Sequence, residues 1–121
     1  MNFAPLRNGL QALAKAGESY ETALRKAPLS GSLAEVDRTL IGTERALTSP
    51  DGLPGRPWFQ HLIYAPGLYT GYGVKTIPGV REAIEQKKWE EADREILRAA
   101  RALEQAADLI DTARKVLEGA K

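Results

Sequence analysis

The 121-residue sequence contains no cysteine and only one histidine, His61. The absence of cysteine excludes disulfide bonds, thiolate metal ligands and a cysteine nucleophile. A single histidine cannot supply the cluster of imidazoles that holds a catalytic metal ion, so we predict no metal site and no cofactor in this chain. None of the four serines stands in a nucleophile elbow. We therefore predict no catalytic residues and no enzymatic activity for this chain by itself.

Strong net charge and long apolar runs are also missing. The 17 basic and 16 acidic residues leave a net charge of +1, too weak a field to indicate binding to nucleic acid or to an anionic membrane. The apolar run Leu62 to Pro66 is far shorter than the roughly 20 residues of a membrane span, and no signal sequence follows Met1. We expect no nucleic-acid partner and no membrane insertion. The cellular compartment stays unknown, and an exported parent protein would place the chain outside the cytoplasm.

What the sequence does have is helical periodicity, and its length fits a single domain over residues 1–121. The first helix is predicted over about 5–26. Its apolar side chains recur at intervals of three, four or seven residues and are expected to face the core; they are Leu6, Leu10, Leu13, Tyr20 and Leu24. The second helix, about 32–48, begins with a capping box formed by Ser32 and Glu35.

The last predicted helix, about 89–118, has the strongest periodicity, and a shorter helix precedes it over 78–87. Its apolar positions alternate alanine with larger residues: Trp89, Ala92, Ile96, Ala99, Leu103, Ala106, Ile110, Ala113 and Leu117. This seam predicts close packing against other helices, with Trp89 in the core. The remaining charged positions are interpreted as a solvated face: Glu91, Arg94, Glu95, Arg98, Arg101, Glu104, Asp108, Asp111 and Lys115. We therefore predict an all-α fold, a helical bundle of about four helices.

Residues 49–77 form a long loop that crosses between the second and third predicted helices. The segment holds four of the seven prolines, five of the 11 glycines and five of the eight aromatic residues. A flexible linker would be poor in large rings, so we predict an ordered loop that is stiffened by its prolines and aromatics. Loops of this length inside a compact domain are usually functional.

The run from Leu53 to Pro66 in this loop reads Leu-Pro-Gly-Arg-Pro-Trp-Phe-Gln-His-Leu-Ile-Tyr-Ala-Pro, and Pro78, Gly79 and a long alanine-rich helix follow. This arrangement resembles the C-terminal helical domain of the transferrin receptor and glutamate carboxypeptidase II family, most closely that of its bacterial peptidase-like members. In that family the segment reads approximately Leu-Pro-x-Arg-Pro-aromatic-aromatic-x-His-x-Ile-Tyr-Ala-Pro. The resemblance covers essentially the whole chain in helix order.

The resemblance implies a dimerisation domain. Such a domain packs as a helical bundle, forms much of a twofold homodimer interface and rests against a zinc peptidase domain that precedes it in the chain. Zinc would belong to that peptidase domain. We expect this chain to be an excised fragment or a free-standing relative of the domain, with a second copy of itself and the peptidase domain of the parent protein as partners.

The resemblance also implies that the loop lends residues to the substrate pocket of the parent enzyme. In the family, a Lys-Tyr pair from the glycine-rich loop grips the glutamate side chain of the substrate. The tyrosine falls on Tyr72, but the lysine position is occupied by Gly71, so the sequence departs from the pattern that selects acidic C-terminal residues. Tyr69 has glycine neighbours like Tyr72, and both are interpreted either as pocket or domain contacts or as packing residues.

The other motif residues are assigned structural roles in the loop: Arg56, Trp58, Phe59, His61, Tyr64 and Pro66. Arg56 would hold loop carbonyls or a carboxylate of a neighbouring domain through its guanidinium, or lie in water. Trp58 and Phe59 would fill the core beneath the loop or anchor an interface. For His61 we favour a half-buried ring hydrogen-bonded to loop backbone over metal binding or catalysis.

Two functions of other classes stay open. One is a free-standing helical scaffold or regulator that binds a separate peptidase in trans, which binding to a peptidase chain lacking this domain would reveal. The other is a small helical enzyme that uses His61 or Tyr72. That enzyme would require a concave pocket with perturbed titratable groups around these residues.

Overall fold

The computed structural model describes residues 1–26, 33–57, 59–66 and 74–119. These residues form four helices and two short strands: α1 (Ala4–Lys26), α2 (Leu33–Ala46), β1 (Tyr64–Pro66), β2 (Val74–Thr76), α3 (Pro78–Glu85) and α4 (Trp89–Gly119). The predicted all-α helical bundle is confirmed, and each helix begins and ends within two residues of its predicted bounds. Ser32, the expected cap of the second helix, lies outside the described residues.

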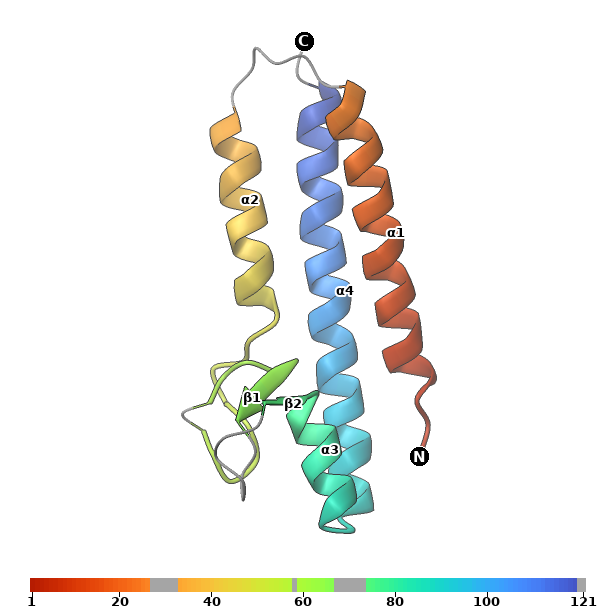
Figure 1. Cartoon of the computed structure of the whole chain (residues 1–121), viewed down its shortest axis with the longest axis vertical. Helices are drawn as coiled ribbons and strands as arrows, with labels where there is room; N and C mark the ends of the chain where they lie inside the picture. The colour runs from red at the N-terminus through yellow and green to blue at the C-terminus, as the bar shows by residue number, and fades with distance from the viewer. Residues whose placement is uncertain (27–32, 58, 67–73, 120–121) are drawn as a thin grey trace.

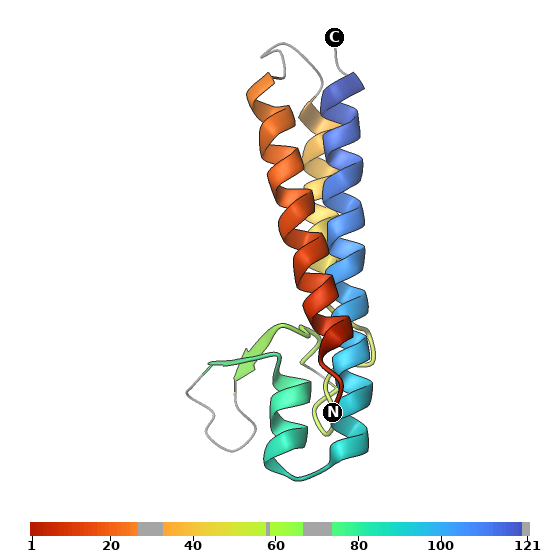
Figure 2. The same cartoon turned by 90° about the vertical axis from the view of Figure 1, so that its right-hand side faces the viewer.

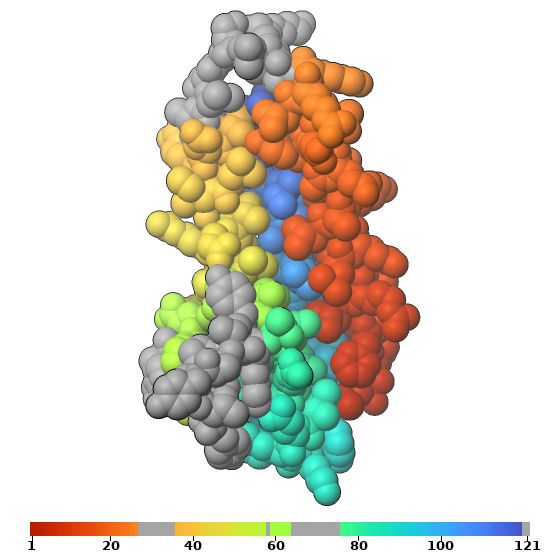
Figure 3. Space-filling model, in the orientation of Figure 1, coloured from red at the N-terminus to blue at the C-terminus, as the bar shows by residue number. Residues whose placement is uncertain are grey.

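Helix α4 is the central element of the bundle. Helices α1 and α2 lie on either side of it and contact it along much of its length, and α3 packs against its N-terminal part (Figure 1). The two views together show α1 running in the same direction as α4 and α2 running in the opposite direction (Figure 2). The space-filling view shows part of α4 exposed between α1 and α2 (Figure 3). Within the described residues, no helix is apolar over enough of its length to cross a lipid bilayer.

The alanine seam of α4 packs as the periodicity predicts. Ala92, Ala99, Ala106 and Ala113 are at most 2% exposed. The small side chains let α1 approach closely, and a Cβ at Gly9 of α1 would lie only 3.1 Å from the carbonyl oxygen of Ala100. The main core cluster joins three helices and consists of Leu6, Val80, Ile96, Ala99 and Leu103.

Three apolar residues that the sequence places in the core are instead exposed. Trp89 is 51% exposed, because it is the first residue of α4 and lies at the end of the bundle beside the turn from α3. Leu10 and Leu24 are 50% and 49% exposed. Helix α1 buries the predicted Leu6 together with three small residues that the prediction did not include, Gly9, Ala16 and Ala23. Because these positions take up the core-facing side, the prediction was wrong for the flanking leucines.

The crossover segment is more regular than the sequence predicts. Strands β1 and β2 form an antiparallel ribbon in which Ala65 pairs with Lys75. Each strand has three residues, too few for a hydrophobic alternation to be recognised in the sequence. The ribbon leads directly into α3, because the backbone N–H of Ile77 donates to the carbonyl of Ile63 and Pro78 occupies the first turn of the helix. The ribbon and the start of α3 are therefore joined by backbone hydrogen bonding.

Candidate functional site: the anchored crossover and the exposed apolar surface

The crossover is fastened to α3 by a buried ion pair. Arg56 and Glu82 are 4% and 7% exposed, and the guanidinium donates to the Glu82 carboxylate. The guanidinium carbon also lies 5.1 Å from the centre of the Phe59 ring, a cation–π arrangement. Because charged side chains are stable inside a protein only when they are paired, this contact fixes the crossover to α3 at one point. The carboxylate that Arg56 contacts belongs to α3 of the same domain, a partner that the sequence-based alternatives did not include.

The backbone around Arg56 is a tight turn that depends on two glycines. The N–H of Leu53 donates to the carbonyl of Phe59, and the N–H of Arg56 donates to the carbonyl of Leu53; both N···O distances are 2.9 Å. Gly52 and Gly55 both adopt positive φ, which side-chain-bearing residues rarely do. A Cβ at Gly52 would also overlap the carbonyl of Pro57. The Leu-Pro-Gly-Arg-Pro sequence therefore folds as a tight turn that directs Arg56 toward the interior.

A second anchor joins the crossover to α4 through Glu95 and Arg98. The Arg98 guanidinium donates to both Glu95 carboxylate oxygens and to the carbonyl of Gly52, all at 2.8 Å. Glu95 is only 5% exposed, so its predicted position on a solvated face was wrong. The carboxylate lies against Gly79 in the first turn of α3, where a Cβ would overlap it. Periodicity within α4 does not reveal this burial, since the covering residue belongs to another helix.

His61 provides a third anchor, at the end of α2. The ring Nδ1 accepts a hydrogen bond from the Ile63 N–H at an N···N distance of 3.2 Å, and Nε2 lies 3.0 Å from the Glu44 carboxylate. Because Nδ1 accepts, the hydrogen of the neutral ring is on Nε2 and points to Glu44. The Leu62 N–H also donates to the Leu47 carbonyl. His61 thus contacts loop backbone and the Glu44 carboxylate, and no group of three or more potential metal ligands occurs among the described residues.

The other motif residues lie in three different settings. Phe59 packs against a small core cluster formed by Leu53, Leu62 and Ala102. Tyr64 and Pro66 are the first and last residues of β1. Four predicted site residues lie outside the described part of the chain, and the structure therefore does not address their roles: Trp58, Tyr69, Gly71 and Tyr72.

A cavity of about 210 Å³ lies where the crossover meets α3 and α4, and its lining includes Arg56, Glu82 and Lys88. Ligand pockets typically measure about 300–1,000 Å³, so this cavity is too small for a peptide substrate. Its buried carboxylate already pairs with Arg56. Among the described residues, the lining of this cavity contains no serine, threonine, cysteine or histidine.

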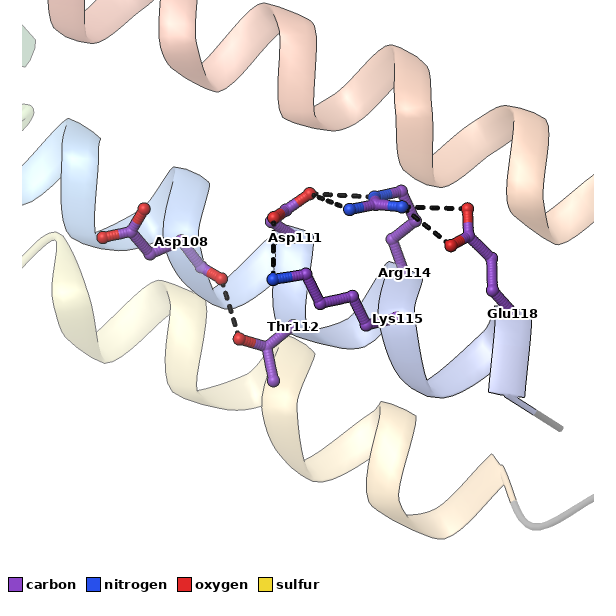
Figure 4. A network of polar contacts seen from close by, with 6 residues as sticks. All are labelled: Asp108, Asp111, Thr112, Arg114, Lys115 and Glu118. Atoms are coloured by element: carbon purple, nitrogen blue, oxygen red, sulfur yellow. Dashed lines mark hydrogen bonds and ion pairs between the residues drawn. The ribbon is translucent and has the colours of Figure 1, made fainter.

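The C-terminal half of α4 carries a network of ion pairs on its surface (Figure 4). Arg114 lies 2.8 Å from both Asp111 and Glu118, and Lys115 lies 3.7 Å from Asp111. The hydrogen bond from Arg114 holds the pKa of Asp111 below its ordinary value of 3.8, and the same bond, with that to Glu118, raises the pKa of Arg114. All members belong to one helix at spacings of three or four residues. The network supports the helix and is not an acid–base pair.

Several large apolar side chains stand outside the core. They are at least 39% exposed and comprise Met1, Phe3, Leu10, Leu24, Ile41, Trp89 and Leu97. Leu10 and Leu24 lie two heptads apart on one flank of α1. The sequence contains this spacing, but helical periodicity alone does not separate a stripe that faces the core from one beside it. Exposed apolar surface of this kind marks interaction sites.

Comparison with known proteins agrees with these observations. Residues 1–111 match the sequence model of the family described as the transferrin receptor-like dimerisation domain. The chain is 42% identical over 93 residues to the probable glutamate carboxypeptidase LAMP1 of Arabidopsis thaliana, covering 69% of this chain and 14% of that protein. It is 35% identical over 89 residues to an inactive zinc metalloprotease of Schizosaccharomyces pombe, covering 73% of this chain and 11% of that protein. The chain thus spans about a seventh or less of the length of these curated relatives.

Proposed function

Because the chain belongs to the transferrin receptor-like dimerisation domain family, we propose that it is a non-catalytic helical domain that holds two copies of a glutamate carboxypeptidase-like protein together. The observation that carries this proposal is the family match over residues 1–111, which includes all four helices except the last turns of α4. The exposed apolar side chains on α1 and α4 supply surface for association. The anchored crossover is fixed before binding, which would lower the entropy cost of any contact that it makes.

We propose further that the domain packs against a zinc peptidase domain in the same protein. The support is that similar relatives are named as glutamate carboxypeptidases or as a zinc metalloprotease, and that they are about seven or more times longer than the matched region. The described part of this chain contains no metal-ligand group of its own, so zinc would be bound by the peptidase domain. The three anchors fix the described part of the crossover around Arg56 and His61, which would present a defined surface for such a contact.

The dimerisation proposal predicts a reversible dimer for the 121-residue chain. We expect the weight-average mass to rise from the 13.2 kDa monomer toward twice that value between about 1 and 500 μM, a range that brackets the dissociation constants of weak interfaces. Sedimentation equilibrium measures this mass directly. A mass that stays at the monomer value over the whole range would contradict the proposal.

We propose, from the family resemblance, that Tyr72 contributes to the substrate pocket of the complete peptidase, and this predicts a kinetic effect of Tyr72 there. Replacing Tyr72 with alanine is expected to raise KM for a peptide substrate by about tenfold with a smaller change in kcat, because a residue that grips the substrate side chain contributes mainly to binding. Tyr72→Phe keeps the ring and is the matched control for the hydroxyl. Unaltered kinetics for Tyr72→Ala would contradict a contribution of Tyr72 to the substrate pocket. The dimerisation proposal would not be affected by that result.

A further inference from the structure

We propose that Ile77 is a strained joint that fixes the angle at which the ribbon of β1 and β2 projects from the bundle. This inference concerns the conformation of the chain and does not depend on the proposed dimerisation function. Ile77 stands between the end of β2 and Pro78, the first residue of α3. Its backbone has φ 47° and ψ 59°, in the left-handed region. A β-branched residue is a rare exception there, because its Cβ crowds the following carbonyl oxygen.

The helix that follows Ile77 does not explain this conformation. Among the described residues, Lys87 is the other residue apart from glycine with positive φ, at 59°. Lys87 follows the end of α3, where a left-handed residue lets the Lys88 N–H donate to the Ala83 carbonyl, and its side chain is exposed. Ile77 instead precedes a helix, at a position where the backbone is normally extended. The left-handed backbone of Ile77 is therefore held by tertiary contacts.

Two contacts hold Ile77 in place. Its N–H donates to the Ile63 carbonyl. Since Tyr64 pairs with Thr76 in the ribbon, Ile63 and Ile77 are the next pair of the same antiparallel register. The half-buried side chain of Ile77 packs against the main core cluster, as does that of Ile63. Ile77 is thus joined to the ribbon by its backbone and to the bundle by its side chain.

Beyond this pair the ribbon extends away from the bundle (Figure 2). Strand β2 packs against α3, the helix that directly follows it. The direction of the ribbon therefore depends on the backbone at its base, where the chain changes from strand to helix within the single residue Ile77. Rotation of Ile77 to an extended or right-handed backbone would turn the ribbon relative to α3 and withdraw the side chain from the core. The left-handed backbone keeps the ribbon at one angle, in one position for a neighbouring domain.

The strain test compares Ile77→Ala with Ile77→Gly by urea denaturation of the full 121-residue chain. Both substitutions remove the packed side chain, and they differ only in the Cβ. We expect the unfolding equilibrium constant of Ile77→Ala to be about threefold larger than that of Ile77→Gly, because glycine carries no left-handed penalty. Ile84 is the matched control, since it is also half-buried and packs against the same cluster but lies within α3. There the glycine variant is expected to be the less stable, by about twofold or more.

The angle test measures the distance between two nitroxide labels by pulsed electron–electron double resonance. The chain has no cysteine of its own, so Lys75→Cys and Asp108→Cys label one site on the ribbon and one exposed site on α4. Asp108 lies about 18 Å along α4 from Ile96 of the core cluster, which brings the pair into the measurable range. Ile77→Ala is expected to at least double the width of the distance distribution, because the residue leaves the left-handed region once its core contact is lost. Ile84→Ala and the conservative Ile77→Val are expected to keep the parent distribution.

The outcomes test the strain and the joint separately. If Ile77→Ala is as stable as Ile77→Gly or more stable, the strain is overturned. An unchanged distance distribution in Ile77→Ala, or an equal broadening in Ile84→Ala, overturns the assignment of Ile77 as the joint. A more stable glycine variant together with broadening confined to residue 77 supports the inference. Far-ultraviolet circular dichroism verifies that each variant is folded, and Ile77→Gly provides the same distance measurement if Ile77→Ala is not. The mass measured by sedimentation equilibrium tests dimerisation independently of these results.

Discussion

Replacing Arg56 with alanine is expected to lower the free energy of unfolding by about 3–5 kcal/mol. The substitution removes the guanidinium from a carboxylate that is itself only 7% exposed, so Glu82 would stay buried without the cation that contacts it. It also removes the cation from the face of the Phe59 ring. Desolvating a carboxylate without its partner costs far more than the pair contributes, which explains the size of the effect.

Urea denaturation followed by circular dichroism measures this loss. Arg25→Ala is the matched control, because Arg25 also pairs with a glutamate but in water, and it is expected to cost less than about 0.5 kcal/mol. The double variant Arg56→Met with Glu82→Leu removes both charges and keeps most of the volume, and it is expected to recover most of the stability. A loss below about 1 kcal/mol for Arg56→Ala would show that the pair does not anchor the crossover.

The anchor also connects stability with the proposed function. Arg56 lies in the crossover, Glu82 in α3, and the neighbouring Arg98 on α4 holds the carbonyl of Gly52. These contacts join the crossover to two helices by side chains that are distant in sequence. The turn that carries Gly52 and Arg56 is thereby held in one place, as a surface that rests on another domain requires.

The helices could be predicted from the sequence because their signal is local. Leu6 and Leu13 of α1, and the alanine seam of α4, recur with a period that only a helix satisfies. The same period does not predict which of two adjacent apolar faces of a helix is buried. It describes a single helix and carries no information about how much of that helix its neighbour covers. Leu10 and Trp89 were assigned to the core for this reason, and both are about half exposed.

The partners of the site residues were beyond sequence reasoning for a different reason. Arg56 was singled out from the motif, but Glu82 lies 26 residues away on a helix whose own pattern gives no sign of a buried acid. Glu95 was read as solvated because its burial comes from Gly79 of another helix. A glycine in a first helical turn and a glutamate on a charged face become a contact only when the two helices are placed together.

Ile96→Ala is expected to lower the free energy of unfolding by about 3–4 kcal/mol. Ile96 is 1% exposed in the cluster that joins Leu6 of α1 and Val80 of α3 to α4, so truncation leaves a cavity at the meeting point of three helices. Leu97, the next residue, is 45% exposed, and Leu97→Ala is the matched control with an expected loss below about 1 kcal/mol. Both losses are measured by urea denaturation.

The comparison of these adjacent residues tests the architecture itself. Domains of this size are stable by about 5–15 kcal/mol, so the Ile96 loss would be a large fraction of the total, whereas the Leu97 loss would be minor. Equal losses at the two positions would mean that α4 is rotated from the orientation described. A large difference fixes which face of α4 packs against α1 and α3.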